Sequence, residues 1–266
     1  MTRRFYLIDI EGVLVPDKSY RPLPGAVAWL AGLADRDIGW RLVSNNTTHR
    51  PGDLVAALGQ AGFTVEPAHL ISALTVGAAW LREQGVQRLG WLGSAKLREW
   101  WQAQGFALVD TAAERCEVVV LGVHPEQRIA DLDRALAWLQ DGAALLCMHR
   151  NRFWLDAAGQ ARLGPGAWAA ALETAVPQVR TVTAGKPEPT IYRLALDSLG
   201  APPQDALFIS DDPFSDLVGA RRLGLGTVFV LSGKYPDRQV LAGLPPDQQP
   251  DLIVERVDQL TENRRA

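Results

Sequence analysis

The sequence predicts an α/β protein built on a parallel sheet. Along the 266 residues, apolar runs of strand length alternate with stretches of helical periodicity, and several of the runs end in small polar or acidic residues. Runs that are apolar throughout are typical of strands covered by helices on both faces. Ligands of such sheets bind at the carboxyl ends of the strands, so the polar ends of these runs are the first candidates for a site.

The first run, Phe5–Ile8, ends at Asp9, and Glu11 and Gly12 follow. We expect Asp9 to lie at the ligand-binding edge and Gly12 to let the chain turn away from the sheet. An aspartate at a strand end is also common as a cap for the next turn. The case for Asp9 therefore depends on the strand ends that come later.

The second strand is predicted over residues 40–43, after a helix over residues 25–36. This strand–helix–strand order is a crossover unit of parallel strands. A short helix that opens at Pro51 completes this part of the chain. Small polar residues stand between the second strand and that helix, namely Ser44, Asn45 and Asn46.

The middle of the chain is predicted to be a second α/β layer, because it has an alternation of its own. The helices are expected over residues 74–84, 95–104 and 126–140, and the strands over residues 88–92, 116–121 and 144–148. The last of these strands leads into a polar stretch that contains Arg150 and Arg152.

From about residue 181 the pattern of the first part of the chain resumes, with apolar runs that end in polar or acidic residues. A short strand precedes Lys186, and the proline that follows favours an extended conformation at this lysine. A strand over residues 206–209 then ends at Asp211, and Asp216 lies near the start of the next helix. Two further strands, over residues 227–231 and 252–254, complete the expected sheet.

Composition excludes several classes of function. The formal net charge is -3 and there is no basic stripe, which argues against a nucleic-acid or anionic-membrane surface. No run approaches the roughly 20 apolar residues of a membrane span. The two cysteines, Cys116 and Cys147, lie in apolar runs, as is typical of buried thiols in a reducing compartment. With no apolar stretch of signal-peptide length before Asp9, we expect a cytoplasmic protein.

Together the strand ends predict phosphoryl-transfer chemistry. Oxygen-rich sites bind Mg²⁺, which needs one or two carboxylates besides a substrate phosphate. A lysine neutralises charge on the transferring group, hydroxyl and amide groups orient it, and an aspartate can accept it covalently. The candidates are the carboxylates Asp9, Glu11, Asp211 and Asp216, the cation Lys186, and the polar residues Ser44, Asn45 and Asn46.

The order of these motifs resembles the haloacid dehalogenase (HAD) superfamily of phosphatases. The motifs are Asp-x-Glu-Gly-Val from Asp9, Ser-Asn-Asn from Ser44, Gly-Lys-Pro around Lys186, and Asp-Asp-x-x-x-Asp from Asp211. The long insertion is similar to the α/β (C2-type) cap of the NagD-like, p-nitrophenylphosphatase (class IIA) subfamily. The resemblance implies a Rossmann-like parallel-sheet core over residues 1–76 and 183–266, with the cap over residues 77–182. Other stretches, such as 164–166 and 232–235, most resemble the subgroup of phospholysine phosphohistidine inorganic pyrophosphate phosphatase.

The resemblance also implies roles. Asp9 would be the nucleophile that forms an aspartyl-phosphate, and Lys186 would hold both Asp9 and the phosphate. Ser44, with Asn45 and Asn46 beside it, would bind the phosphoryl group. The remaining roles concern proton transfer and Mg²⁺: Glu11 would be the general acid and base and offer its backbone carbonyl to the metal, Asp211 would be a ligand, and Asp216 would support the metal's waters.

Two positions depart from the family pattern. Glu11 stands where the family usually has aspartate, and catalytic geometry tolerates errors of only ~0.5 Å. A weakened acid would restrict the enzyme to good leaving groups, since general acid catalysis contributes roughly 10²–10⁴-fold. Ser210 stands where the family usually has glycine. These departures leave an alternative open, a degenerate family member that binds a phosphorylated ligand or partner without turnover.

Other classes fit less well. A phospho-acceptor signalling module is shorter and carries its acidic pair with the first strand, and a dinucleotide enzyme needs a Gly-x-Gly-x-x-Gly that is missing after the first strand. Arg150 and Arg152 are the candidates for substrate selection, because an arginine pair favours a second anionic group. A solvated or interface turn is the competing explanation for them. The family further suggests a homodimer packed through the cap.

Overall fold

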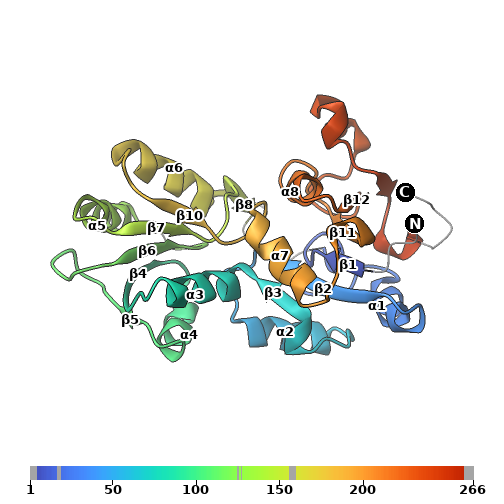
Figure 1. Cartoon of the computed structure of the whole chain (residues 1–266), viewed down its shortest axis with the longest axis horizontal. Helices are drawn as coiled ribbons and strands as arrows, with labels where there is room; N and C mark the ends of the chain where they lie inside the picture. The colour runs from blue at the N-terminus through green and yellow to red at the C-terminus, as the bar shows by residue number, and fades with distance from the viewer. Residues whose placement is uncertain (1–4, 17–18, 125, 127, 156–159, 261–266) are drawn as a thin grey trace. The chain divides into compact units, whose positions relative to one another are not determined.

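The computed structural model describes residues 5–16, 19–124, 126, 128–155 and 160–260. The chain divides into two compact units, each with its own parallel sheet (Figure 1). The predicted α/β class is confirmed by these sheets. Unit 1 comprises Met1–Ser44, Pro51–Ser72 and Lys186–Ala266, and unit 2 comprises Asn45–Arg50 and Ala73–Gly185. The boundaries between the units lie a few residues from the ends expected for the cap, residues 77 and 182. In addition, the loop Asn45–Arg50 groups with unit 2.

Unit 1 contains a six-stranded sheet in the order β13-β12-β11-β1-β2-β3, with all neighbours parallel. β1 lies at the centre, where Ile8 is in register with Ile209 on one side and with Leu42 on the other. The strands are β1 (Phe5–Ile8), β2 (Gly39–Ser44), β3 (Leu70–Ser72), β11 (Ala206–Ser210), β12 (Gly226–Val230) and β13 (Leu252–Val254).

Helices cover both faces of this sheet. On one face, Tyr6 stacks on Trp29 with ring centroids 6.1 Å apart. On the other face, Phe208 meets Tyr192 edge to face at 5.1 Å. Burial of such side chains on both faces is the main force that holds the layers together. The helices of unit 1 are α1 (Ala26–Asp35), α2 (Pro51–Gln60), α7 (Pro189–Asp197) and α8 (Asp216–Arg222).

Unit 2 contains a five-stranded parallel sheet in the order β10-β7-β6-β4-β5 and an antiparallel hairpin of β8 and β9. Trp138 packs so closely on Gly90 that a Cβ there would overlap the indole ring. The strands are β4 (Arg88–Leu92), β5 (Ala107–Leu108), β6 (Val118–Leu121), β7 (Ala144–Cys147), β8 (Phe153–Leu155), β9 (Ala161–Leu163) and β10 (Thr181–Thr183). The helices are α3 (Ala73–Glu83), α4 (Arg98–Ala103), α5 (Ile129–Gln140) and α6 (Pro165–Ala175).

The predicted elements are present, with shifted ends. The expected helix over residues 95–104 begins as a 3₁₀ turn, Ala95–Leu97, and only then becomes α4. Four strands are not expected from the sequence, namely β3, β5, β8 and β9, because runs of two or three residues carry no periodicity. Within the described ranges, the helices are too short or too polar to cross a membrane.

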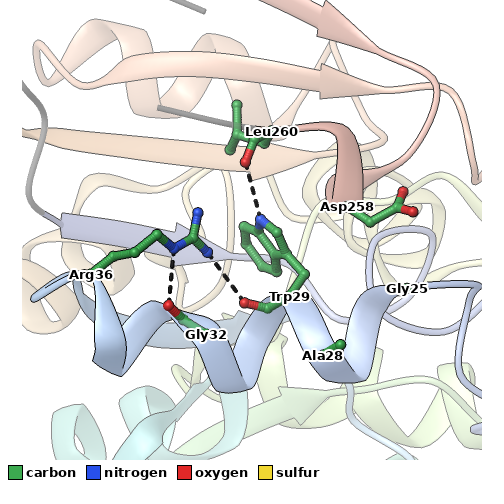
Figure 2. A pocket seen from close by; sticks show the side chains of 7 residues that line it. All are labelled: Gly25, Ala28, Trp29, Gly32, Arg36, Asp258 and Leu260. Atoms are coloured by element: carbon green, nitrogen blue, oxygen red, sulfur yellow. Dashed lines mark hydrogen bonds between the residues drawn. The ribbon is translucent and has the colours of Figure 1, made fainter. Parts of the chain in front are cut away.

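A shallow hollow of about 430 Å³ lies between α1 and residues 258–260 of unit 1 (Figure 2). Trp29 forms part of its wall, and its indole Nε1 donates to the Leu260 carbonyl at 3.4 Å. Arg36 lines it as well, while its guanidinium donates to the Gly32 and Trp29 carbonyls. The residues that line it include none of those predicted for the site.

Candidate active site

Strand register brings two acidic strand ends together in unit 1. The Asp9 N–H donates to the Ile209 carbonyl at 2.9 Å, which continues the pairing of β1 with β11 beyond Ile8. Asp9 therefore lies level with Ser210, the last residue of β11, and Asp211 follows directly. Both carboxylates are buried. The expectation that the ends of these two strands share one edge of the sheet is met.

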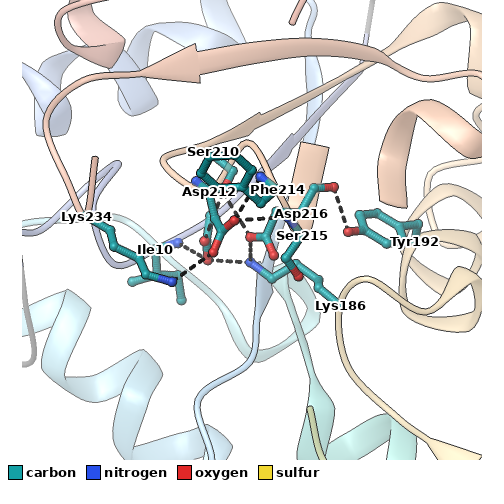
Figure 3. Close-up of polar contacts among 10 residues, drawn as sticks. Ile10, Lys186, Tyr192, Ser210, Asp212, Phe214, Ser215, Asp216 and Lys234 are labelled. Atoms are coloured by element: carbon teal, nitrogen blue, oxygen red, sulfur yellow. Dashed lines mark hydrogen bonds and ion pairs between the residues drawn. The ribbon is translucent and has the colours of Figure 1, made fainter. Parts of the chain in front are cut away.

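Lys186 links the nucleophile candidate to the start of α8. Its Nζ lies 2.6 Å from Asp216 Oδ2 (Figure 3). The same Nζ lies 2.7 Å from Asp9 Oδ1, and the lysine side chain is almost fully buried. The carbonyl of Asp216 accepts a hydrogen bond from the Tyr192 hydroxyl of α7 at 2.8 Å. Helix packing thus fixes Asp216, and the ammonium group joins it to Asp9.

The two oxygens of Asp9 are in different environments. Oδ1 accepts from the Lys186 ammonium and from the Ile10 N–H at 2.9 Å. Within the described part of the chain, the contact of Oδ2 is with the Ser210 hydroxyl, at the long distance of 3.3 Å. The arrangement holds the carboxylate by one oxygen and leaves the lone pairs of the other available for reaction.

Ser210 is a buried hydroxyl among acids. It lies 2.9 Å from Asp216 Oδ2, and it accepts from the Asp212 N–H at 3.1 Å. A serine hydroxyl has one proton, so the shorter contact to Asp216 takes it in preference to Asp9. The residue that departs from the family's glycine therefore ties Asp216 to the loop after β11.

We expect Ser210→Ala to lower the free energy of unfolding by about 1–3 kcal/mol, because the Asp212 N–H would be left without its buried acceptor. Urea unfolding measures this loss. Thr64→Ala is the control, since Thr64 is exposed and its hydroxyl forms no hydrogen bond within the described ranges, so its removal should change stability by no more than about 0.5 kcal/mol. An equal effect of the two substitutions would show that the Ser210 contacts contribute nothing.

Burial, and after it the repulsion between neighbouring acids, raises the pKa values of the carboxylates in this cluster. Burial raises the pKa of Asp216 to about 7, although Lys186 opposes the shift. Burial also raises the pKa of Asp211 to about 6, although the hydrogen bond from the Lys234 N–H opposes this shift. The pKa of Asp9 is raised by burial as well. The pKa of Lys186 is raised because the attraction of Asp216 and Asp9 outweighs its burial. The site thus has an excess of negative charge that a bound cation would relieve.

Lys234 is a residue of the site that the motifs do not single out, although the stretch 232–235 that resembles the family contains it. Its backbone N–H donates to Asp211 Oδ2 at 2.6 Å, and its Nζ lies 3.1 Å from Asp212 Oδ2. Asp212 Oδ1 meanwhile accepts from the Phe214 and Ser215 N–H groups (Figure 3). Of the two adjacent aspartates, Asp212 therefore holds the loop, and Asp211 is the one left for a ligand.

Glu11 and Ser44 lie near this edge in different ways. Glu11 is half-buried, in the turn after β1, and its charge is close enough to raise the pKa of Asp9. Ser44 is fully buried at the carboxyl end of β2, in register with Ser72. Both positions fit the predicted roles, which stay predictions.

Asn45 and Asn46 belong to unit 2. The Asn45 side chain lies against Gly185, where a Cβ would overlap its Oδ1. Asn46 Oδ1 accepts from the Thr48 and His49 N–H groups, both at 3.0 Å, and so shapes its own loop. These contacts give both asparagines a structural function in unit 2, and their substrate-binding role stays a prediction.

Arg150 is engaged within unit 2. Its guanidinium forms a two-point ion pair with Glu173, at 2.8 and 3.0 Å, and its Nε donates to Thr183 at 3.0 Å. The hydrogen bonds from Arg150 hold the pKa of Glu173 below its usual value. Arg152 is exposed, and its backbone carbonyl accepts from Gly164 at 2.8 Å. A role in substrate selection stays a prediction for both, and Arg152 is the one with an exposed side chain.

The residues of unit 1 fit a divalent cation. Within the described ranges, no three His, Cys, Asp or Glu side chains already form a metal-binding group. Mg²⁺ does not need one, because it keeps several waters and takes one or two carboxylates plus phosphate oxygens. Asp9 and Asp211 are buried, adjacent and negatively charged, which is the donor chemistry that Mg²⁺ prefers.

Comparison with known proteins identifies the family. A model described as haloacid dehalogenase-like hydrolase matches residues 6–107, and one described as HAD-hydrolase-like matches residues 183–260. The human haloacid dehalogenase-like hydrolase domain-containing protein 2 is 32% identical over 231 residues, which are 86% of this chain and 84% of the human protein. The chain belongs to the haloacid dehalogenase superfamily.

Other relatives narrow the position of this HAD protein. Dihydroxyacetone phosphatase from Corynebacterium glutamicum (strain R) is 29% identical, with 88% of this chain and 83% of that protein covered. Human phospholysine phosphohistidine inorganic pyrophosphate phosphatase is 25% identical, with 98% and 95% covered. Relatives that are named for an activity are phosphatases, and this HAD protein is a phosphatase.

Solved structures agree with this assignment. The p-nitrophenyl phosphatase from Archaeoglobus fulgidus has a TM-score of 0.85 at 26% identity, covering 97% of this chain and 98% of that one. NagD from E. coli shares the fold with a TM-score of 0.83 at 23% identity, covering 98% and 100%. A glycerol phosphate phosphatase from Mycobacterium tuberculosis, in complex with magnesium, has a TM-score of 0.80 at 25% identity, covering 95% and 75%. The predicted NagD-like class, a Rossmann-like HAD core with an α/β cap domain, is confirmed.

Proposed function

We propose that this HAD phosphatase is Mg²⁺-dependent and hydrolyses a small phosphorylated metabolite through an aspartyl-phosphate on Asp9. The observation that carries the proposal is the asymmetry of the Asp9 carboxylate. Lys186 and the Ile10 N–H hold Oδ1, whereas Oδ2 has only the long contact with Ser210 among the described residues. A carboxylate held by one oxygen and free at the other is oriented for nucleophilic attack.

In the first step, Asp9 Oδ2 attacks phosphorus and the bond from phosphorus to the leaving oxygen breaks. Glu11 gives its proton to that oxygen, so that the product leaves as an alcohol. Lys186 stays bound to Oδ1 and offers its positive charge to the phosphoryl oxygens. The Ser44 hydroxyl orients the same oxygens.

In the second step, the ionised Glu11 takes a proton from a water molecule. That water attacks phosphorus, the bond from phosphorus to Asp9 breaks, and inorganic phosphate leaves. Asp9 is restored as a carboxylate and Glu11 as an acid. Bound Mg²⁺, held by Asp9, Asp211 and the Glu11 carbonyl, would neutralise charge on the transferring group.

The substrate class that we propose is a small phosphate monoester. Dihydroxyacetone phosphate and glycerol phosphate lead the list because relatives at 29% and 25% identity are named for them. An exposed Arg152 would favour substrates with a second anionic group if it reaches the substrate. The predicted cytoplasmic location and the homodimer through the cap stay predictions, and gel filtration tests the second.

The test is phosphate release from a panel of phosphorylated metabolites, pyrophosphate and p-nitrophenyl phosphate, with Mg²⁺ or with EDTA. We expect turnover with Mg²⁺ and a fall of at least about 10²-fold in EDTA, because the metal neutralises charge in the transition state. Re-addition of Mg²⁺ after EDTA is the control and should restore activity. Full activity in EDTA would remove the metal from the proposal, and silence on every substrate would favour the alternative of binding without turnover.

A further inference from the structure

Lys234 touches the acidic cluster twice, once through its backbone and once through its side chain. The N–H holds Asp211 at 2.6 Å, and Nζ holds Asp212 at 3.1 Å. The ammonium also lies 5.1 Å from the ring centroid of Tyr235, which meets Phe214 edge to face at 5.2 Å. The aromatic pair and Asp212 together keep the ammonium beside the acids.

The loop that carries Lys234 is built closely around Asp211. A Cβ on Gly233 or on Gly12 would overlap the Asp211 carboxylate, so the backbone at both glycines packs directly against this carboxylate. The Ser232 hydroxyl donates to the Gly12 carbonyl at 2.7 Å and holds the two loops together. The position of Lys234 is therefore fixed by the same contacts that fix the predicted metal ligand.

The charges of this cluster leave a defined excess. Among the described residues, the buried carboxylates are those of Asp9, Asp211, Asp212 and Asp216, and the ammonium groups beside them are those of Lys186 and Lys234. Glu11 is a fifth carboxylate near Asp9, half-buried and more open to solvent than these four. When the four buried carboxylates are all ionised, two negative charges remain uncompensated among them, which matches the charge of one divalent cation.

The use of lysine at this position is selective. The chain has four lysines against 23 arginines, and two of the four stand in this cluster. An arginine would bind a carboxylate through two points of its rigid fork, whereas an ammonium is a compact point charge. A point charge can compensate Asp212 without taking the second oxygen of a neighbouring acid.

We propose that the positive charge of Lys234 partly compensates the metal-binding acids. This charge lowers the affinity of the site for Mg²⁺ and raises its affinity for a phosphate dianion. The inference rests on the proposed function. Lys234 acts through Asp211 and Asp212 and is a positioning residue. Removing its charge adds a third uncompensated negative charge, which attracts a metal ion more strongly and repels phosphate. The two effects have opposite signs, and loss of a merely structural contact would not produce that pattern.

The test compares Lys234→Met with Lys96→Met, which removes an exposed lysine of unit 2. Isothermal titration measures the Kd of Mg²⁺ without substrate, and inhibition by inorganic phosphate in saturating Mg²⁺ measures the Ki of phosphate. We expect Lys234→Met to lower the Kd of Mg²⁺ and to raise the Ki of phosphate, each by roughly twofold to fivefold, the upper part of the range for a partly exposed ion pair. Lys96→Met should change neither.

Two further variants keep the test decisive. Lys234→Gln should reproduce both shifts should the Met variant fold poorly, because glutamine keeps a donor but not the charge. Lys234→Arg keeps the positive charge and should not tighten Mg²⁺ binding; because its fork can also take an oxygen of a neighbouring acid, the Kd of Mg²⁺ should stay at or rise above the wild-type value. Unchanged or weakened Mg²⁺ binding in Lys234→Gln, with wild-type binding intact, overturns the inference alone. Absence of Mg²⁺ binding in the wild type overturns the metal-dependent function and the inference with it.

Discussion

Asp9→Asn should abolish turnover, with kcat at least about 10³-fold below the wild type. An amide oxygen is a far weaker nucleophile than a carboxylate, and the change keeps the shape of the side chain. Lys186 would retain its contact with Asp216, so the site would keep one of its two ion pairs. Phosphate release from p-nitrophenyl phosphate in saturating Mg²⁺ measures the effect.

The control for Asp9→Asn is Asp251→Asn. Asp251 pairs with Arg221 at 2.7 Å and accepts from the Thr227 N–H, at the opposite, amino end of β12. This variant should keep kcat within about twofold of the wild type, since it removes no group from the site. A kcat for Asp9→Asn above a tenth of the wild-type value would end the proposal that Asp9 carries the phosphoryl group.

Lys186→Met should lower the free energy of unfolding by about 3 kcal/mol or more, because it leaves two buried carboxylates without their shared cation. The lysine side chain is 2% exposed, so water cannot replace the lost charge. Turnover should fall as well, since the phosphoryl oxygens lose a positive charge. Urea unfolding in EDTA measures the stability, and phosphate release measures the turnover.

Lys96→Met is again the matched control, and it should change stability by less than about 0.5 kcal/mol. Added Mg²⁺ should recover part of the stability that Lys186→Met loses, because a bound cation compensates the same acids. If Lys186→Met is as stable as Lys96→Met in EDTA, the two ion pairs of Lys186 do not hold unit 1 together.

The elements that a topological rule governs could be predicted from the sequence. Asp9 and Asp211 follow apolar runs, and the carboxyl ends of neighbouring parallel strands necessarily share one edge. Lys186 and Asp216 could be added because their motifs flank the same sheet. The fold class needed only the alternation of strand and helix.

The contacts that depend on loop conformation could not be predicted. Nothing in the sequence indicates that Asp212 turns toward Lys234 or that Ser210 prefers Asp216 to Asp9, because side-chain direction in a loop has no period. Residues that are adjacent in the sequence also need not belong to the same unit. Ser44 and Asn45 are neighbours in the sequence, yet they fall in different units, because the chain leaves the sheet between them. The ion pair of Arg150 with Glu173 likewise joins residues that no motif connects.

The pairing of β1 with β11 also sets an order of events during synthesis. Phe5 pairs with Ala206, so β1 is synthesised long before β11, the second of its two neighbours in the sheet. The stretch Ala73–Gly185, by contrast, is continuous and carries a sheet with its own apolar core. On the ribosome, this stretch can become compact while β1 still has an open edge, a state in which unpaired strands are prone to aggregate. Asp9 can meet Lys186 and Asp211 only after the whole intervening stretch, unit 2 included, has been synthesised.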